Sequence, residues 1–319
     1  MRSAKTKPKF SKNQKDSRVT EIYRYSDFLA PKFWSTWLAI AGLHIIAWLP
    51  WRLKIGFAHL LCAVIKRFAK SRYNTVVANI RACFSDLPAD EQARLIEDAL
   101  FANAFGLIET AHAWVRGING LEIEIKGWEN YQAAKQDGRG ILVFTCHFSM
   151  LDLGAAMLGS EIPVGTIYRK HDNPLFNYFM TRSREQFVEY TVARKDIKAM
   201  IRHLRAGDNL AYLPDQDFGP KRSVFVPFFG VPAATIPMTS QLAEAGNAIV
   251  LPISAYRVGK SPKYVMTIHP LMNIPTDDHI ADTHTWVNWL EDCVREHPEQ
   301  YLWFHKRFKT RPEGEPSVY

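Results

Sequence analysis

Residues 140–152 read GILVFTCHFSMLD. The apolar run 141–146 is typical of a buried strand, and the residues after it are typical of a helix over 150–158. His147 would then stand at the carboxyl end of the strand, which is the edge where open α/β sheets bind their ligands. Asp152 would fall in the first turn of the helix, where the helix dipole favours an ionised carboxylate. This placement suits chemistry better than packing.

The pair suits general base catalysis. A neutral imidazole can accept a proton from a hydroxyl group near neutral pH, and a carboxylate on its other ring nitrogen fixes the tautomer. We therefore predict that His147 is a general base and that Asp152 orients it. The alternative is a structural histidine at a strand end, with Asp152 as a helix-start residue.

Beyond residue 127, apolar runs alternate with helical stretches. This alternation predicts an α/β fold in which a mostly parallel mixed sheet is flanked by helices. Strands are expected over 141–146, 164–169, 188–193, 209–214, 248–256 and 264–269. Helices are expected over 150–158, 174–186, 196–206, 236–245 and 283–297.

The N-terminal region has a different composition. Residues 1–32 are polar and basic, which predicts a tail that is disordered in its first part. Residues 33–51 form an apolar run with Trp near both ends, and residues 53–68 are amphipathic. Tryptophan at both ends is typical of a membrane segment, but a span needs about 20 apolar residues. We favour a shallow or re-entrant membrane anchor over 33–70, followed by a catalytic domain over 71–319; two buried core helices are the alternative.

Residues 72–116 are expected to be helical, with a start signal at 87–90. Apolar residues recur at spacings of three and four, which indicates a face that packs on the core. Asn103, Glu109 and His112 lie along this helix. Their expected roles are solvation or capping.

Composition narrows the class of protein. The chain has 319 residues and a net charge of +8, which favours acidic partners. Its four cysteines (Cys62, Cys83, Cys146 and Cys293) are scattered, so neither a disulfide framework nor a zinc site is indicated. No nucleic-acid recognition motif is present.

Ionisable residues also follow two other expected strands. Arg169 could hold a phosphate or stabilise negative charge at a carbonyl oxygen through its planar guanidinium. Asp215 and Asp217 could bind a metal ion or cap a tight turn. Three strand ends would thus present charged groups at one edge of the sheet.

Further motifs accompany the His-x4-Asp pattern of residues 147–152. They include YRKHDNP at 168–174, RKD at 194–196, PDQDFGP at 214–220, SVFVPFF at 223–229, PEQYLW at 298–303 and HKRFKTRPEG at 305–314. With these motifs the chain resembles the late, or secondary, acyltransferases of lipid A biosynthesis, particularly the lauroyl-transferring branch. The resemblance runs from residue 28 to the C-terminus. Asp152 stands where that branch usually has Glu, and either carboxylate can orient a histidine.

The resemblance implies transfer of a fatty acyl group, lauroyl or similar, from acyl carrier protein to a hydroxyl on an acyl chain of the Kdo-modified lipid A precursor. This is a step of lipopolysaccharide or lipooligosaccharide biosynthesis at the cytoplasmic face of the inner membrane. The expected partners are acyl carrier protein, the lipid A precursor and inner-membrane lipids. A monomer is expected, with no cofactor, no metal and no nucleic acid. The residues expected to bind substrate are Arg169, Asn173, Asp215, Asp217, Lys221, Arg222, His305, Arg307 and Arg311.

The expected chemistry needs no covalent intermediate. A hydroxyl group becomes a nucleophile once a base removes its proton, and a thioester already carries a good leaving group. Cys146 precedes His147, but neighbouring strand residues point to opposite faces, which disfavours a nucleophilic role for Cys146. Two other classes remain open: a membrane-tethered phospho- or glycosyltransferase that uses Asp215 and Asp217 on a divalent cation, and a catalytically idle lipid-binding module.

Overall fold

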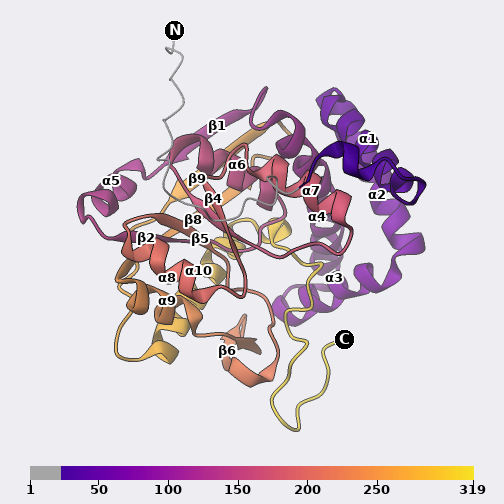
Figure 1. The fold of residues 1–319 in the computed structure, drawn as a ribbon. Helices are drawn as coiled ribbons and strands as arrows, with labels where there is room; N and C mark the ends of the chain where they lie inside the picture. Colours follow the sequence, from indigo (N-terminus) through magenta and orange to yellow (C-terminus); the bar gives the residue numbers. More distant parts are fainter. Residues whose placement is uncertain (1–22) are drawn as a thin grey trace.

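A seven-stranded sheet forms the centre of the computed structural model, which describes residues 23–319 (Figure 1). The strand order is β1-β9-β8-β2-β5-β3-β4. The strands are β1 (Glu122–Lys126), β2 (Gly140–Phe144), β3 (Gly165–Tyr168), β4 (Tyr190–Ala193), β5 (Asn209–Tyr212), β8 (Ala248–Arg257) and β9 (Lys263–Ile268).

Most of the sheet is parallel. Five consecutive strands of the sheet are parallel to one another: β8, β2, β5, β3 and β4. Strand β9 runs antiparallel to β8, and β1 lies parallel to β9. The predicted fold class, a mostly parallel mixed sheet flanked by helices, is therefore confirmed. The edge strand β1 and the separate antiparallel hairpin of β6 (Val224–Phe228) and β7 (Val231–Thr235) were not predicted.

Helices cover both faces of the sheet, so β2 is buried throughout. Along β2, Leu142 and Phe144 join the hydrophobic cluster that includes residues of α8, α9 and α10. Ile141 and Val143 join the cluster that includes residues of α5 and α6. The helices of these clusters named here are α5 (Trp128–Gln136), α6 (Leu151–Glu161), α8 (Ile197–Arg205), α9 (Met238–Gly246) and α10 (His279–Glu296). Helix α7 is Pro174–Arg184.

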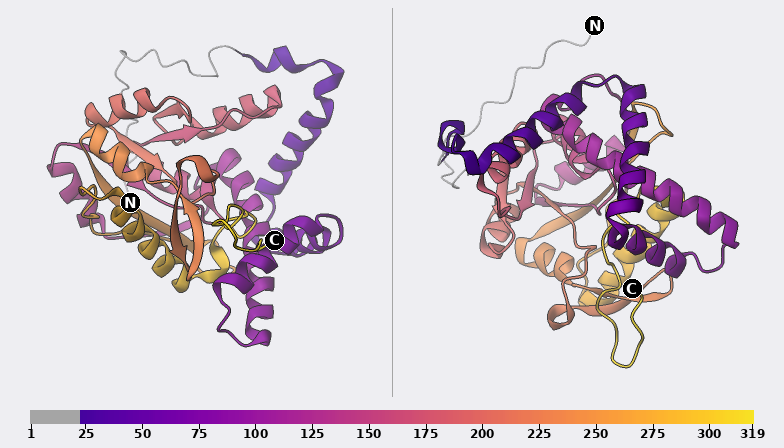
Figure 2. Two further views of the ribbon diagram at one scale, coloured as in Figure 1. Left: turned by 90° about the horizontal axis from the view of Figure 1, so that it is seen from below. Right: turned by 90° about the vertical axis from the view of Figure 1, so that its right-hand side faces the viewer.

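Four helices precede the sheet and lie together at one side of the molecule (Figure 2). They are α1 (Trp34–Trp48), α2 (Trp51–Phe68), α3 (Lys70–Cys83) and α4 (Ala89–Arg116). The region 72–116, which was predicted to be helical, forms the two helices α3 and α4. Helix α4 begins at Ala89, within the predicted start signal at 87–90.

The central helix α4 contacts α1, α2, α3 and α6. Because neighbours surround it, its polar residues are enclosed: Asn103, Glu109 and His112 are 3%, 1% and 3% exposed. The prediction that these residues are solvated or capping is wrong. Asn103 donates to the carbonyl oxygen of Tyr301, and Glu109 and His112 also have side-chain hydrogen bonds, as described below.

The first two helices bury little of their surface. α1 buries Ile40 and Ala47, and α2 buries Lys54 and Ala58. Some of their other apolar side chains, such as Ile46, Ile55 and Leu61, pack partly on a buried cluster. Many large ones are exposed, so α1 and α2 are not the two fully buried core helices of the alternative interpretation. The exposed large side chains on α1 and α2 are Trp34, Leu38, Ile45, Trp48, Leu53, Leu60, Val64 and Phe68.

Over residues 23–319, every helix is too short or too polar to cross a membrane by itself. The predicted tail over 1–32 lies, for residues 1–22, outside the described part of the chain. Residues 25–28 and 31–33 form short 3-10 helices, and Phe28 is buried.

Candidate active site

A pocket of about 1000 Å³ opens at the carboxyl edge of the parallel strands. Residues 145–148, which follow β2, line it together with residues 168–169 after β3 and Leu213 after β5. His147 is therefore placed at the strand end that the sequence predicts for it. His147 lies in the loop after β2 and lines the pocket.

The ring of His147 pairs with a carboxylate, but not with the predicted one. Its Nδ1 lies 2.7 Å from Oδ1 of Asp215, which follows the adjacent strand β5. The backbone N–H of His147 also donates to Oδ2 of Asp215, at 3.0 Å. Two contacts to one carboxylate fix both the position and the plane of the imidazole.

Asp215 is held in its ionised form although it is only 1% exposed. Burial alone would raise the pKa of Asp215, but the charge and hydrogen bonds of His147 outweigh it, so the pKa lies below its ordinary value. The hydroxyl of Tyr301 donates to Oδ2 at 3.0 Å. An ionised carboxylate only accepts hydrogen bonds, so Nδ1 of His147 carries the proton and Nε2 is left as a base.

Asp152, the predicted orienting residue, faces a different partner. The guanidinium of Arg184 donates to both of its carboxylate oxygens, at 2.6 and 3.0 Å. Because this bidentate ion pair uses the carboxylate, the predicted contact between Asp152 and His147 is wrong. Asp152 and Arg184 both line the pocket, so the pair forms part of its wall.

Cys146 is unsuited to act as a nucleophile. It is 1% exposed, and burial together with the nearby Asp215 carboxylate raises the pKa of its thiol well above the ordinary value. The thiolate is the reactive form of cysteine. The structure thus supports the prediction that the chemistry does not pass through Cys146.

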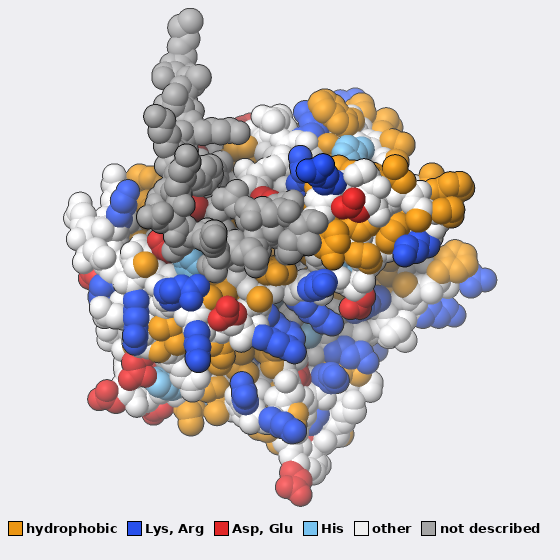
Figure 3. All heavy atoms as spheres, in the orientation of Figure 1, with side chains coloured by type: hydrophobic (Ala, Val, Ile, Leu, Met, Phe, Trp, Pro, Cys, Tyr) orange, Lys and Arg blue, Asp and Glu red, His pale blue; other side chains and the backbone are white. Residues whose placement is uncertain are grey.

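Cations surround the mouth of the pocket. Arg169, Arg194, Lys221 and Arg222 line it and are exposed. Among residues 23–319, no carboxylate forms an ion pair with any of these four side chains. Lys and Arg side chains spread across the face shown in Figure 3, while hydrophobic side chains gather over α1 and α2. We call Arg169, Arg194, Lys221 and Arg222 the basic rim.

Several other residues predicted to bind substrate have structural partners instead. Asn173 accepts from the backbone of Phe176 as the N-cap of α7 and donates to Thr36 of α1. Asp217 accepts from the backbone and hydroxyl of Thr310, at 2.7 and 2.9 Å. Neither Asn173 nor Asp217 lines the pocket.

The C-terminal cations are also occupied within the protein. His305 accepts from the backbone N–H of Asp217, and burial lowers its pKa to about 4, so it is neutral. Arg307 is 1% exposed and donates to the hairpin strand β7. Arg311 donates to the carbonyl oxygen of Pro232 and pairs with Glu315. The prediction that these three residues form a substrate-binding surface is not supported, because their side chains hydrogen-bond to other parts of the protein or, for Arg311, also pair with Glu315.

Asp215 and Asp217, which the sequence suggested as a possible metal-binding pair, have different hydrogen-bond partners. Asp215 accepts from His147 and Tyr301, whereas Asp217 accepts from the backbone N–H groups of Gly219 and Thr310. Within the described residues 23–319, no group of three His, Cys, Asp or Glu side chains is arranged to hold a metal ion.

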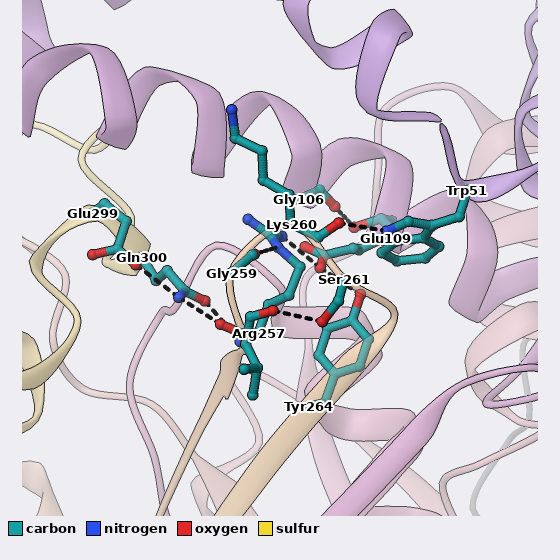
Figure 4. Close-up of polar contacts among 12 residues, drawn as sticks. Trp51, Gly106, Glu109, Arg257, Gly259, Lys260, Ser261, Tyr264, Glu299 and Gln300 are labelled. Atoms are coloured by element: carbon teal, nitrogen blue, oxygen red, sulfur yellow. Dashed lines mark hydrogen bonds and ion pairs between the residues drawn. The ribbon is translucent and has the colours of Figure 1, made fainter. Parts of the chain in front are cut away.

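A second polar cluster lies inside the protein, where α4 meets the ends of β8 and β9 (Figure 4). Arg257 and Tyr264 both donate to Oε1 of Glu109, each at 2.7 Å. Arg257 also exchanges backbone hydrogen bonds with the side chain of Gln300. The carbonyl oxygen of Gln300 in turn accepts from Ser149, two residues beyond His147. The cluster therefore anchors the segment that hydrogen-bonds to the loop bearing His147.

Comparison with known proteins assigns the chain to a family. The sequence profile described as bacterial lipid A biosynthesis acyltransferase matches residues 23–310. The chain belongs to this family. It is an acyltransferase of lipid A biosynthesis, so the metal-dependent transferase and the idle lipid-binding module are not retained.

Individual relatives agree with this assignment. The lipid A biosynthesis lauroyltransferase of Escherichia coli is 35% identical over 94% of this chain and 100% of that protein. The palmitoleoyltransferase of the same organism is 31% identical over 92% and 97%, and its myristoyltransferase is 28% identical over 92% and 92%. A 1-acyl-sn-glycerophosphate acyltransferase structure from Thermotoga maritima, at 16% identity over 77% of this chain and 97% of that one, gives a TM-score of only 0.37 and adds nothing to the assignment.

Proposed function

We propose that this lipid A acyltransferase takes its acyl group from acyl carrier protein and transfers it to a hydroxyl on an acyl chain of the Kdo-modified lipid A precursor. The observation that carries the proposal is the His147–Asp215 pair at the end of a large, mainly apolar pocket. A base beside an apolar pocket suits a reaction between a hydroxyl and a fatty acyl thioester.

The geometry supports a general base mechanism. Nε2 of His147 removes the proton of the acceptor hydroxyl, and Asp215 stabilises the imidazolium that forms. The hydroxyl oxygen attacks the thioester carbonyl and forms the ester bond, and the carbon–sulfur bond breaks. The imidazolium then returns its proton to the leaving thiolate, so that ester and free thiol are the products. Tyr301 keeps Asp215 in place throughout.

The basic rim supports the assignment of the substrates. Lipid A precursors carry phosphates and acidic sugars, and acyl carrier protein is acidic. Exposed guanidinium groups form bidentate hydrogen bonds with phosphates. Arg169, Arg194, Lys221 and Arg222 stand where the polar part of a substrate would lie when its hydrocarbon part enters the pocket.

The exposed apolar side chains of α1 and α2 support docking on a membrane. An exposed apolar patch of this kind marks an interaction surface, and Trp residues suit the interface between lipid and water. Arg67 is exposed in the last turn of α2, and its positive charge favours anionic lipids. We propose that these helices lie in the cytoplasmic face of the inner membrane, as a shallow or re-entrant anchor rather than a span.

The proposed donor chain is lauroyl or similar, on the similarity to the lauroyltransferase of Escherichia coli. The test is an assay with the purified full chain, a lipid A precursor and lauroyl-acyl carrier protein. Mass spectrometry should show the precursor gain one acyl group and the carrier lose it. Turnover should continue with a strong chelator. Failure to modify the precursor with any acyl-carrier donor would refute the proposed function.

A further inference from the structure

The pocket reaches both faces of the sheet. Leu158, Ala211 and Ile253 line it and belong to the hydrophobic cluster on the α6 face. Met200 and Leu242 line it and belong to the cluster on the opposite face, with α8 and α9. The reacting group at the sheet edge therefore has apolar surface on two sides. A reaction between a fatty acyl donor and a hydroxylated acyl chain brings two hydrocarbon chains to one base.

One of these sides is formed mainly by α6. Met150, Leu151, Gly154, Ala155 and Leu158 line the pocket there. We call these five residues the α6 wall. The ion pair between Asp152 and Arg184 adjoins this wall, and its opposite charges neutralise each other. The wall is thus apolar, with no unpaired charge among its own residues.

Gly154 is the residue of this wall that leaves most room. It lies inside α6, where glycine is a poor helix former. A Cβ built on Gly154 would meet no other atom within 4 Å. By contrast, a Cβ on Gly106 or Gly159 would lie 2.0 or 1.7 Å from a backbone oxygen. Packing therefore explains Gly106 and Gly159, whereas at Gly154 the space opens into the pocket.

Three cations of the basic rim are adjacent in the chain to elements of the opposite face. Arg194 lies just before α8, and Lys221 and Arg222 lie just before β6; α8, α9 and β6 all contribute to the hydrophobic cluster on that face. A chain attached to a phosphorylated head group fits this side, since the cations can hold the phosphates while the chain lies on α9. The α6 wall then remains for a chain that brings no charge of its own.

We propose that the acyl chain of the donor lies along the α6 wall and that Gly154 determines the longest chain that is transferred. The inference rests on the proposed function, because it assigns a place to the donor of that reaction. Filling the space at Gly154 with a side chain should shorten the chain that fits.

The experiment compares the unaltered protein with Gly154→Leu and Gly154→Ala. Each is supplied with one lipid A precursor and acyl-carrier-protein thioesters of graded saturated chain length. Gly154→Leu should fold, because leucine favours helix over glycine. Its kcat/KM for the longest donor that the unaltered protein uses should fall by roughly 10- to 200-fold, which is the discrimination of a hydrophobic pocket against one excess methylene group. Shorter donors should still react, and Gly154→Ala should be intermediate.

Ala133→Leu is the control. Ala133 is exposed on α5, outside the pocket and outside the helices proposed to bind the membrane. Its donor preference should equal that of the unaltered protein. An unchanged donor preference in a folded Gly154→Leu protein would overturn the inference. So would a raised KM for the acceptor with no change in donor preference, which would assign the wall to the acceptor chain. If the unaltered protein transferred no acyl group from any donor, the proposed function itself would fail.

Discussion

Nδ1 of His147 lies 2.7 Å from Oδ1 of Asp215, a residue 68 positions further along the chain. Because β2 and β5 are adjacent in the sheet, the loops that follow them meet at the pocket. The carboxylate fixes the tautomer of the imidazole, so the nitrogen that remains free is Nε2.

The first prediction concerns this pair. His147→Ala should reduce turnover by at least about a hundredfold, because the acceptor hydroxyl loses its base. Asp215→Asn should also reduce turnover by about a hundredfold or more, since an amide can donate to Nδ1 and favour the wrong tautomer. Turnover is measured by mass spectrometry of the product, and thermal unfolding reports whether each variant folds. Near-normal turnover in folded His147→Ala would exclude the mechanism.

The second prediction concerns Asp152 and Arg184. Asp152→Ala should destabilise the protein by about 3 kcal/mol, because it leaves a mostly buried guanidinium without its partner. Replacing both residues by Ala should recover part of that loss. Denaturant unfolding measures both effects. If Asp152→Asn instead shifted the pH dependence of turnover with no loss of stability, Asp152 would act on His147 directly.

The third prediction concerns the basic rim. Arg169→Ala should lower kcat/KM for the lipid A precursor roughly tenfold, the effect of losing one hydrogen bond to a charged group. Arg169→Lys should not restore it, because a point charge does not reproduce the planar guanidinium. Steady-state kinetics with varied precursor would measure this. Full recovery with Lys would show that charge alone is needed there.

The fourth prediction concerns the membrane surface. Leu38 and Phe68 are 75% and 77% exposed on α1 and α2. Leu38→Asp and Phe68→Asp should each lower binding to anionic vesicles roughly tenfold, since burial of such a side chain contributes about 1.5–3 kcal/mol. Vesicle sedimentation measures the bound fraction. Leu271, which is exposed outside these helices, provides the control variant Leu271→Asp. Equal binding by all three variants would contradict the assignment.

The fifth prediction concerns pH and stability. Burial, with Lys54 and Arg116 nearby, lowers the pKa of His112 to about 4, and Nδ1 of His112 accepts from the Lys54 ammonium. The unfolded chain takes up a proton at this position as pH falls below about 6.5, while the folded protein does not until about 4. His112 should therefore cost about 1.4 kcal/mol of stability per pH unit on acidification in that window.

Denaturant unfolding between about pH 6.5 and pH 4 tests whether His112 contributes to the pH dependence of stability. His112→Gln should weaken the dependence, although His305, whose pKa is also lowered to about 4 by burial, should retain part of it. His59 is exposed, so His59→Gln should leave the dependence unchanged. The same slope in all three proteins would refute the role of His112.

Local sequence patterns predicted much of the fold. Every strand and helix expected beyond residue 127 is present, with ends that differ by a few residues, because apolar runs and their periodicity are local properties. The edge strand β1 was missed because its sequence, EIEIK, alternates charged and apolar residues over only five positions. The buried polar residues of α4 were mispredicted because burial depends on which helices surround it.

The sequence predicted at which strand ends the site residues lie, but not which of these residues are in contact with one another. The sequence places His147, Arg169 and Asp215 after three strands, and the structure does the same. Which strands are neighbours is a property of the sheet order, and no local pattern contains it. The nearest carboxylate in the sequence, Asp152, was therefore chosen over Asp215. Tyr301 lies in the PEQYLW motif at 298–303, but the motif does not show that its partner is Asp215, which is distant along the chain.

The segment around Tyr301 also determines when the enzyme can become active. Residues 300–302 hydrogen-bond to the backbone at His147 and Ser149, and Tyr301 donates to Asp215. A ribosome makes these residues after the whole sheet has been synthesised. The loop that bears His147 therefore lacks these hydrogen bonds until then, and a product ended by a stop codon before residue 300 would have the sheet without them.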